Sequence, residues 1–363
     1  MLPSEAIEEA ISERCAAALA ESQRAHRAAA AVTSGMNLLR YGGCALHAVL
    51  QGGVYDDADT PDIDVFTCRG GSSKKTAHAV AGMLRKEGVE GVRVLPALHR
   101  GTHSVRVGRQ VLVDVTHVTP LEYRLLREAA KHERLHCGNT VPTLFLKMSM
   151  HMELSRPASY IERWRKIWPR LEALYAAYPL ALNHPMPVKP GPPVDTVHLR
   201  DDVVSAAVQA GCVVVGRMAV AELTGVDTLT AWPHDFVLPE ARDPSAVVDG
   251  ICSALDMERS DLRDCGAHGA PYFMITTRDR EYVARVFSIG TEVCTARAGG
   301  IEYGSSDLVL HLLYCEMLRM GAHTVDRQML ADAIDGIVRS QKVRGCRDGV
   351  HRRFGASRRP ARP

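Results

Sequence analysis

The N-terminal part of the chain carries hydrophobic residues at helical spacing. The Ala- and Glu-rich segment 5–31 places Ile7, Ile11 and Cys15 four residues apart, and Ser4 precedes them as a plausible N-cap. This pattern predicts a helix over the segment, or two in succession. Two shorter helices are expected at 44–51, after Gly42-Gly43, and at 72–88, where Ala77, Val80, Ala81 and Leu84 would form the buried stripe.

Extended patterns alternate with these helices. Strand-like runs occupy 60–68, 92–99, 102–107 and 109–118, and VGRQ between the last two is typical of a hairpin turn. From 120 to about 178 the spacing becomes helical again. Helices and short strands mixed in this way favour an α+β domain over 1–182, made of a sheet with flanking helices.

A proline-rich stretch divides the chain in two. Residues 183–196 hold five prolines, a composition that favours an extended, semi-rigid linker. Beyond it a second αβ pattern runs over 197–340. VGRMAVAEL (215–223) resembles YGGCALHAVL (41–50), which suggests an internal duplication, although so short an echo can also arise by chance.

Composition and charge narrow the class of protein. The chain has 363 residues, 46% of them hydrophobic, and a net charge of +2, so overall charge does not indicate nucleic-acid binding. Arginines concentrate in the tail 341–363, which is either a solvated end or an arm that binds a polyanion.

Cysteine spacing and hydropathy indicate the compartment. Ten cysteines include no C-x-x-C pair, and the chain shows neither a signal-peptide pattern nor an apolar run near 18 residues. We expect an intracellular protein in a reducing compartment, with no membrane span.

Three aspartates stand in strand-like segments where carboxylates are disfavoured. Asp62 and Asp64 share one face of the strand TPDIDVFTC (60–68), and Asp114 lies within VLVDVTHV, on the face expected to carry Leu112. Burying an unpaired carboxylate costs several kcal/mol, so each needs a cationic partner. A Lys or Arg would suffice for any one of them, and most isolated D-x-D pairs are solvated.

The order of these residues points to a metal site. Two Mg²⁺ or Mn²⁺ ions about 4 Å apart could be bridged by such carboxylates and bind substrate phosphates. Upstream, the Gly42-Gly43 turn would let backbone N–H groups approach phosphate oxygens at a helix N-terminus.

This arrangement resembles the nucleotidyltransferase superfamily of the DNA polymerase β type. Within it, the chain is similar to the poly(A) polymerase catalytic subunits of poxviruses and related large DNA viruses. The resemblance depends on the motifs YGGCALH (41–47), TPDIDVF (60–66), VLVDVTHV (111–118) and LKMSMHMELSRP with YIERWRKIWPRL (146–157 and 160–171).

The resemblance implies a fold and roles for residues. A polymerase-β-like domain with a mixed sheet would be followed by a second, degenerate nucleotidyltransferase-like domain that is catalytically silent. Asp62, Asp64 and Asp114 would be the catalytic metal ligands, with two Mg²⁺ or Mn²⁺ ions, and Gly42 and Gly43 would contact the nucleotide.

Cationic residues of the helical block are further candidates. Lys147, on an apolar helix, is expected to bind the triphosphate; the alternative is a lysine that extends to water. Arg163, Lys166 and Arg170 share one helix face and are expected to meet RNA phosphates, although a solvated face is an equal alternative.

The implied function is template-independent polyadenylation, in which AMP passes from ATP to an RNA 3′ hydroxyl with release of pyrophosphate. The resemblance implies a homodimer or a processivity subunit as protein partners, and the cytoplasm of an infected cell or the virion as location. Two alternatives stay open: a different nucleotidyltransferase that adds uridylate or modifies a protein, and a non-catalytic RNA-binding scaffold.

Overall fold

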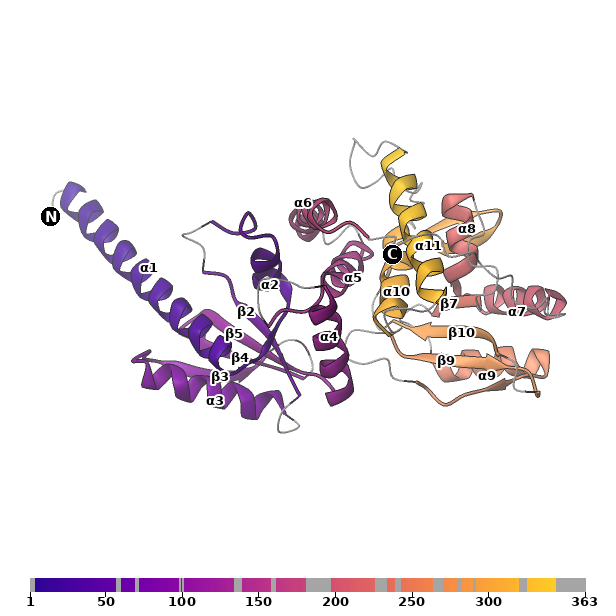
Figure 1. Cartoon of the computed structure of the whole chain (residues 1–363), viewed down its shortest axis with the longest axis horizontal. Coiled ribbons are helices and arrows are strands. Elements are labelled where there is room, and N and C mark those ends of the chain that lie inside the picture. Colours follow the sequence, from indigo (N-terminus) through magenta and orange to yellow (C-terminus); the bar gives the residue numbers. More distant parts are fainter. Residues whose placement is uncertain are drawn as a thin grey trace. The chain divides into compact units, whose positions relative to one another are not determined.

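A computed structural model gives the structure of the chain (Figure 1). The chain divides into two compact units, residues 1–146 and residues 147–363. The residues that the structure describes are 4–56, 60–68, 72–97, 99, 101–133, 139–157, 161–180, 197–225, 234–238, 243–263, 270–279, 282–289, 292–319 and 325–343.

The first unit is built on a five-stranded mixed sheet in the order β1-β2-β5-β4-β3. β2 and β5 are parallel neighbours, and the other pairs are antiparallel. The strands are β1 (Leu39–Arg40), β2 (Ile63–Thr67), β3 (Val92–Pro96), β4 (Thr102–Val107) and β5 (Gln110–His117). Each run expected to be extended therefore contains a strand, and the VGRQ turn joins β4 to β5.

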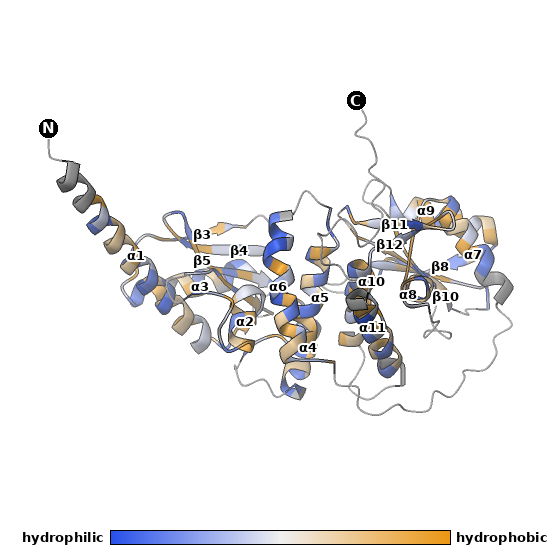
Figure 2. Ribbon diagram, turned by 90° about the horizontal axis from the view of Figure 1, so that it is seen from above, coloured by the Kyte–Doolittle hydropathy of each residue, from blue (hydrophilic) through white to orange (hydrophobic). Residues whose placement is uncertain are grey.

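Two helices cover one face of this sheet. The buried stripe predicted for 72–88 is confirmed on α3 (Ser73–Lys86), and Ser72 caps the helix by accepting a hydrogen bond from the Lys74 N–H. α1 (Ser4–Gly35) is a single long helix. Its C-terminal half adds Ala25, Ala29 and Val32 to the same core, whereas residues 11–21 are exposed. Figure 2 shows both hydrophilic and hydrophobic residues on the coloured part of α1.

One expected strand face is wrong. Leu112 was expected to lie beside Asp114, but it is buried in the core with Val113 and Val115. The cause is a register shift between Val105 and Arg106, where an extra residue of β5 turns Leu112 to the other side. On β5, the side chain of Leu112 therefore does not lie on the face that carries Asp114.

The second unit repeats the topology of the first. Its sheet runs β11-β12-β6-β7-β10-β9-β8, and the last five strands match β1-β2-β5-β4-β3 in order and in parallel or antiparallel sense. The strands are β6 (Val213–Val215), β7 (His234–Leu238), β8 (Glu258–Arg259), β9 (Tyr272–Thr276), β10 (Tyr282–Ser288), β11 (Thr295–Ala298) and β12 (Ile301–Gly304).

The connecting helices repeat as well. α2 (Gly42–Val49) joins β1 to β2, and α8 (Gly216–Thr224) joins β6 to β7 in the same way. α9 (Pro244–Leu255) corresponds to α3 by its place after the second strand. The remaining helices are α4 (Pro120–His132), α5 (Thr143–Leu154), α6 (Ile161–Ala177), α7 (Val197–Gln209), α10 (Ser306–Arg319) and α11 (Val325–Val343). The echo between 41–50 and 215–223 thus marks equivalent places in two similar sheets.

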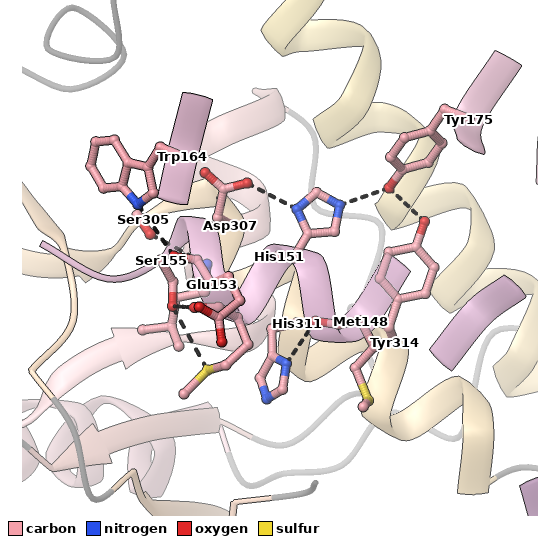
Figure 3. Close-up of polar contacts among 12 residues, drawn as sticks. Met148, His151, Glu153, Ser155, Trp164, Tyr175, Ser305, Asp307, His311 and Tyr314 are labelled. Carbon is pink, nitrogen blue, oxygen red and sulfur yellow. Dashed lines mark hydrogen bonds and ion pairs between the residues drawn. The ribbon is translucent and has the colours of Figure 1, made fainter. Parts of the chain in front are cut away.

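A buried polar network joins α5 and α6 to α10 (Figure 3). His151 Nδ1 lies 2.9 Å from Asp307 Oδ1, and its Nε2 lies 2.9 Å from the Tyr175 hydroxyl. That hydroxyl lies 2.6 Å from the Tyr314 hydroxyl. The sequence grouped 147–178 with the first domain, whereas these bonds tie that segment into the second unit. The expected linker 183–196 and the tail 341–363 lie outside the described residues, apart from the end of α11.

We expect His311 on α10 to make the second unit sensitive to acid. Burial lowers its pKa to about 4, an effect that His151 adds to and the hydrogen bond to the Met148 carbonyl opposes. As the pH falls, the unfolded chain takes up the proton first, near the ordinary histidine value of 6.5. The contribution of neutral His311 to the free energy of unfolding is therefore fully present above pH 6.5. It is lost as the pH falls toward 4, which lowers the free energy of unfolding by about 3 kcal/mol.

Denaturant unfolding at several pH values would measure this loss. His311→Asn is the matched variant, because its amide can still donate to the Met148 carbonyl but does not titrate. Parallel pH profiles for the two proteins would show that His311 is not the sensitive group.

Candidate active site

The three aspartates predicted from the sequence come together on one face of the first unit's sheet, at the neighbouring inner strands β2 and β5. Asp64 on β2 and Asp114 on β5 are register partners on parallel strands, and Asp62 directly precedes β2. One carboxylate oxygen from each lies within 4.8 Å of the others. Asp62 is exposed and the other two are half-buried, so the cluster opens to solvent at Asp62.

The cluster fits a divalent cation. Asp114 Oδ1 is buried and has no hydrogen-bond partner among the described residues. An unpaired buried carboxylate oxygen is costly, and a cation held among three carboxylates would satisfy it. Carboxylate oxygens are the ligands that Mg²⁺ and Mn²⁺ prefer. Asp62, Asp64 and Asp114 are therefore the residues that could hold such an ion.

Gly42 allows the start of α2 to pack directly on Asp64. It adopts φ +67°, and a Cβ built there would lie 2.2 Å from Asp64 Oδ2. The preceding N–H, of Tyr41, donates to the backbone carbonyl of Asp64 at 3.0 Å. No side chain but that of glycine fits this contact, which brings the α2 N-terminus next to the cluster.

Gly43 makes a second close approach. A Cβ at this position would lie 1.9 Å from the Tyr55 hydroxyl oxygen. The Tyr55 N–H donates to His47 Nδ1 at 3.3 Å, which ties the segment after α2 back to that helix. The absence of side chains at Gly42 and Gly43 thus allows the turn to contact Asp64 on one side and Tyr55 on the other.

Replacing Gly42 should disturb the cluster specifically. We expect Gly42→Ala to displace the Asp64 carboxylate and to lower the activity proposed below by about 10²-fold or more, as a 1 Å misplacement does. Gly88→Ala is the matched control, because Gly88 has φ +79° but open space around its Cβ position. Both variants share the backbone strain, so equal activity in the two would contradict the role given to Gly42.

A row of hydroxyl groups lies near the carboxylates, from Tyr41 before α2, Thr116 on β5 and Thr102 on β4. The Tyr41 hydroxyl lies 2.8 Å from Thr116 Oγ1, which lies 2.8 Å from Thr102 Oγ1. The Tyr41 ring stacks on Phe66 with centroids 3.9 Å apart. Burial raises the pKa of Tyr41 far above its ordinary value, and the nearby carboxylates raise it further. Tyr41 therefore stays a neutral hydrogen-bonding group.

Cys44 is not a thiolate ligand. Its thiol donates to the backbone carbonyl of Asp62 at 3.0 Å. Burial, followed by the charges of Asp64 and Asp62, raises the pKa of Cys44 to about 12. A neutral thiol at this position leaves metal binding to the carboxylates.

Lys147 lies on α5, in the second unit, and is 1% exposed. Its ammonium group donates to the Tyr178 carbonyl at 2.5 Å and lies 4.9 Å from the centroid of the Tyr175 ring. The alternative of a lysine that extends to water is therefore wrong. The predicted contact between Lys147 and a triphosphate stays a prediction.

The cations of α6 divide by exposure. Arg163 and Lys166 are exposed, and Arg170 is half-buried. Arg163 forms an ion pair with Glu153 on α5, so part of its charge is already neutralised. Their contact with RNA stays a prediction. Trp164, on the same helix, is 5% exposed and belongs to the core.

The second unit reproduces the glycine–aspartate contact with a different third residue. Gly216 has φ +61°, and a Cβ there would lie 2.6 Å from Asp235 Oδ2. Asp235 on β7 has Arg285 on parallel β10 as its register partner, where Asp64 has Asp114. Arg285 forms a bidentate ion pair with Asp235, at 2.7 and 2.9 Å, and a third bond to Glu316 at 2.7 Å. A guanidinium group thus takes the place of the third carboxylate.

The sequence reading missed Asp235 and Arg285. Its search for a D-x-D pair passed over HDFVL, because the position two before Asp235 is Pro233. The signal was present, since a charged residue inside each of two apolar strands requires a partner.

Comparisons with known proteins agree with the geometry. Residues 32–160 match the family model described as Poly(A) polymerase catalytic subunit. Among solved structures, the chain is similar to one described as "Crystal structure of the Megavirus polyadenylate synthase", with a TM-score of 0.69 and 16% identity over 93% of this chain and 74% of that chain. The search of curated proteins found no match.

These matches bear out the predicted resemblance to viral poly(A) polymerases and the mixed α+β nucleotidyltransferase fold. The family match includes both glycines and all three aspartates, and it ends just before α6. In the part of the chain that the structure describes, no helix is both long and apolar enough to cross a membrane.

Proposed function

With residues 32–160 matching the family of poly(A) polymerase catalytic subunits, we propose that this chain adds AMP from ATP to the 3′ end of RNA without a template. The observation that carries the proposal is the convergence of Asp62, Asp64 and Asp114 within 4.8 Å, inside the matched segment. The glycine turn supports it by bringing the N-terminus of α2 against Asp64.

The transfer exchanges one bond to phosphorus for another. The RNA 3′ oxygen bonds to the α phosphorus of ATP, the bond from that phosphorus to the bridging oxygen breaks, and pyrophosphate leaves with the electron pair. The proton of the 3′ hydroxyl leaves to solvent on the side of Asp62, the exposed member of the cluster. Backbone N–H groups at the start of α2 orient the phosphates.

Asp62, Asp64 and Asp114 would hold two divalent ions, Mg²⁺ or Mn²⁺. When bound, such ions neutralise the phosphate charge and lower the pKa of the attacking hydroxyl. The protein contributes the fixed spacing of the carboxylates, since two of them come from register-paired strands.

Roles are also proposed for cationic residues of α5 and α6. Lys147 would stabilise the triphosphate, and Arg163, Lys166 and Arg170 would bind RNA phosphates. The resemblance leaves a homodimer or a processivity subunit as the proposed protein partner.

The second unit is proposed to be catalytically silent. Arg285 is already paired with both Asp235 and Glu316, so the place of a cation beside these carboxylates is taken by its guanidinium group. A site with one guanidinium and two carboxylates lacks the three-anion arrangement that the transfer uses.

A primer-extension assay tests the proposal. The full chain is mixed with Mg²⁺ or Mn²⁺, labelled RNA and each of ATP, UTP, GTP and CTP in turn, with EDTA as control. We expect extension with ATP that EDTA abolishes. Extension with UTP alone would identify the chain as a different nucleotidyltransferase. No extension with any nucleotide would contradict the addition of nucleotides to RNA.

A further inference from the structure

Ser104 lies beside the third carboxylate of the cluster. It is on β4, and its register partner across the antiparallel pair is Asp114 on β5. Residues directly opposite each other in such a pair point to the same face, with Cβ atoms about 5 Å apart. The Ser104 side chain therefore shares the face on which Asp62, Asp64 and Asp114 converge.

The Ser104 hydroxyl is buried without a partner. The residue is 0% exposed, and its Oγ finds no hydrogen bond among the residues that the structure describes. The next pair on the same face of these two strands behaves differently, since Thr102 and Thr116 bond to each other at 2.8 Å. An unsatisfied buried hydroxyl is unusual in a native protein and needs an explanation.

The second unit supplies a comparison. There, Arg285 stands at the position of Asp114, and its register partner on β9 is Met274, which has no hydroxyl. A hydroxyl group is therefore present opposite the carboxylate that is proposed to bind a cation, and absent opposite Arg285.

We propose that Ser104 is a positioning residue that donates a hydrogen bond to the Asp114 carboxylate when the cluster holds a divalent cation. This inference rests on the proposed function. Rotation about χ1 of a serine moves its hydroxyl among three staggered positions, and a separation of about 5 Å between Cβ atoms allows it to reach a carboxylate oxygen. The bond fixes one oxygen of Asp114 and presents the other to the metal, as outer partners of metal ligands do.

Metal titration by thermal shift tests this role without relying on activity. The full chain is titrated with Mn²⁺ in the presence of α,β-methylene ATP, which cannot release pyrophosphate. We expect Ser104→Ala and Ser104→Cys to raise the Mn²⁺ midpoint about tenfold, and Ser104→Thr, which keeps the hydroxyl, to stay near wild type. In EDTA the alanine variant should melt no lower than wild type, because it loses no hydrogen bond.

Ser73→Ala is the matched control. Ser73 is also buried in the first unit, but its Oγ is paired with His103 Nδ1 at 2.9 Å. It should lose melting temperature in EDTA and keep the wild-type Mn²⁺ midpoint.

The outcomes separate this inference from the proposed function. An unchanged midpoint in Ser104→Ala and Ser104→Cys, with a wild-type protein that responds to Mn²⁺, would overturn the role of Ser104 alone. A wild-type protein that Mn²⁺ does not stabilise would overturn the metal site itself, and the role of Ser104 with it.

Discussion

Asp64→Asn is expected to lower AMP transfer to RNA by about 10³-fold or more. Asp64 is central to the site, since it is the register partner of Asp114 and the residue on which Gly42 packs. A metal ion contributes several kcal/mol of transition-state stabilisation, and each 1.4 kcal/mol, roughly, is a factor of ten in rate. Losing about 4 kcal/mol through one ligand gives the expected factor. Initial rates with labelled RNA and ATP would measure it.

Asn preserves the shape of Asp64, so the fold should be retained. Asp62→Asn and Asp114→Asn should behave alike, whereas Asp261→Asn, which changes an exposed acid outside the cluster, should not alter the rate. A rate within tenfold of wild type for Asp64→Asn would remove the cluster from the chemistry.

Arg285→Met is expected to cost about 3–5 kcal/mol of unfolding free energy in the second unit, the range for breaking a buried ion pair. Arg285, Asp235 and Glu316 are 5%, 4% and 8% exposed, so the variant would remove the guanidinium that both buried carboxylates contact. Denaturant unfolding of the full chain, followed by circular dichroism, would show the loss.

The control is an exposed pair of the same unit. Arg278 contacts Asp256 with both side chains more than 70% exposed, so Arg278→Met should change stability by at most about 1 kcal/mol. If the second unit is silent, Arg285→Met should retain AMP transfer at a temperature where it is folded. A folded variant that has lost activity would assign the second unit a part in the reaction.

The sequence was most informative where the alternation of a strand and the chemistry of its side chains point to the same site. Asp62, Asp64 and Asp114 could be predicted as one site because a carboxylate inside a strand needs a partner, and strand alternation fixes the face to which it points. Gly42 could be predicted from its place before an apolar helix. Its contact with Asp64 needed coordinates, because strand order decides which residue lies beneath the turn.

Other features had no local signal. The register shift at Arg106 that turns Leu112 into the core depends on the pairing of β4 with β5, which no single segment specifies. The placing of residues 147–154 of α5 with the second unit depends on His151 contacting Asp307, a partner 156 residues away. Lys147 could be predicted as a cation on an apolar helix, but the enclosure of its ammonium group near Tyr175 and Tyr178 needed the fold.

The repeated sheet has a consequence for how the chain unfolds. The metal site proposed for the first unit consists of three carboxylates that a bound cation would stabilise, whereas in the second unit Arg285 is already paired with Asp235 and Glu316. A ligand that binds one folded unit stabilises that unit alone unless the two unfold together. Divalent ions should then raise the melting temperature of the first unit and leave that of the second unchanged. The chain would show two unfolding transitions, and the difference between their temperatures would grow with the metal concentration.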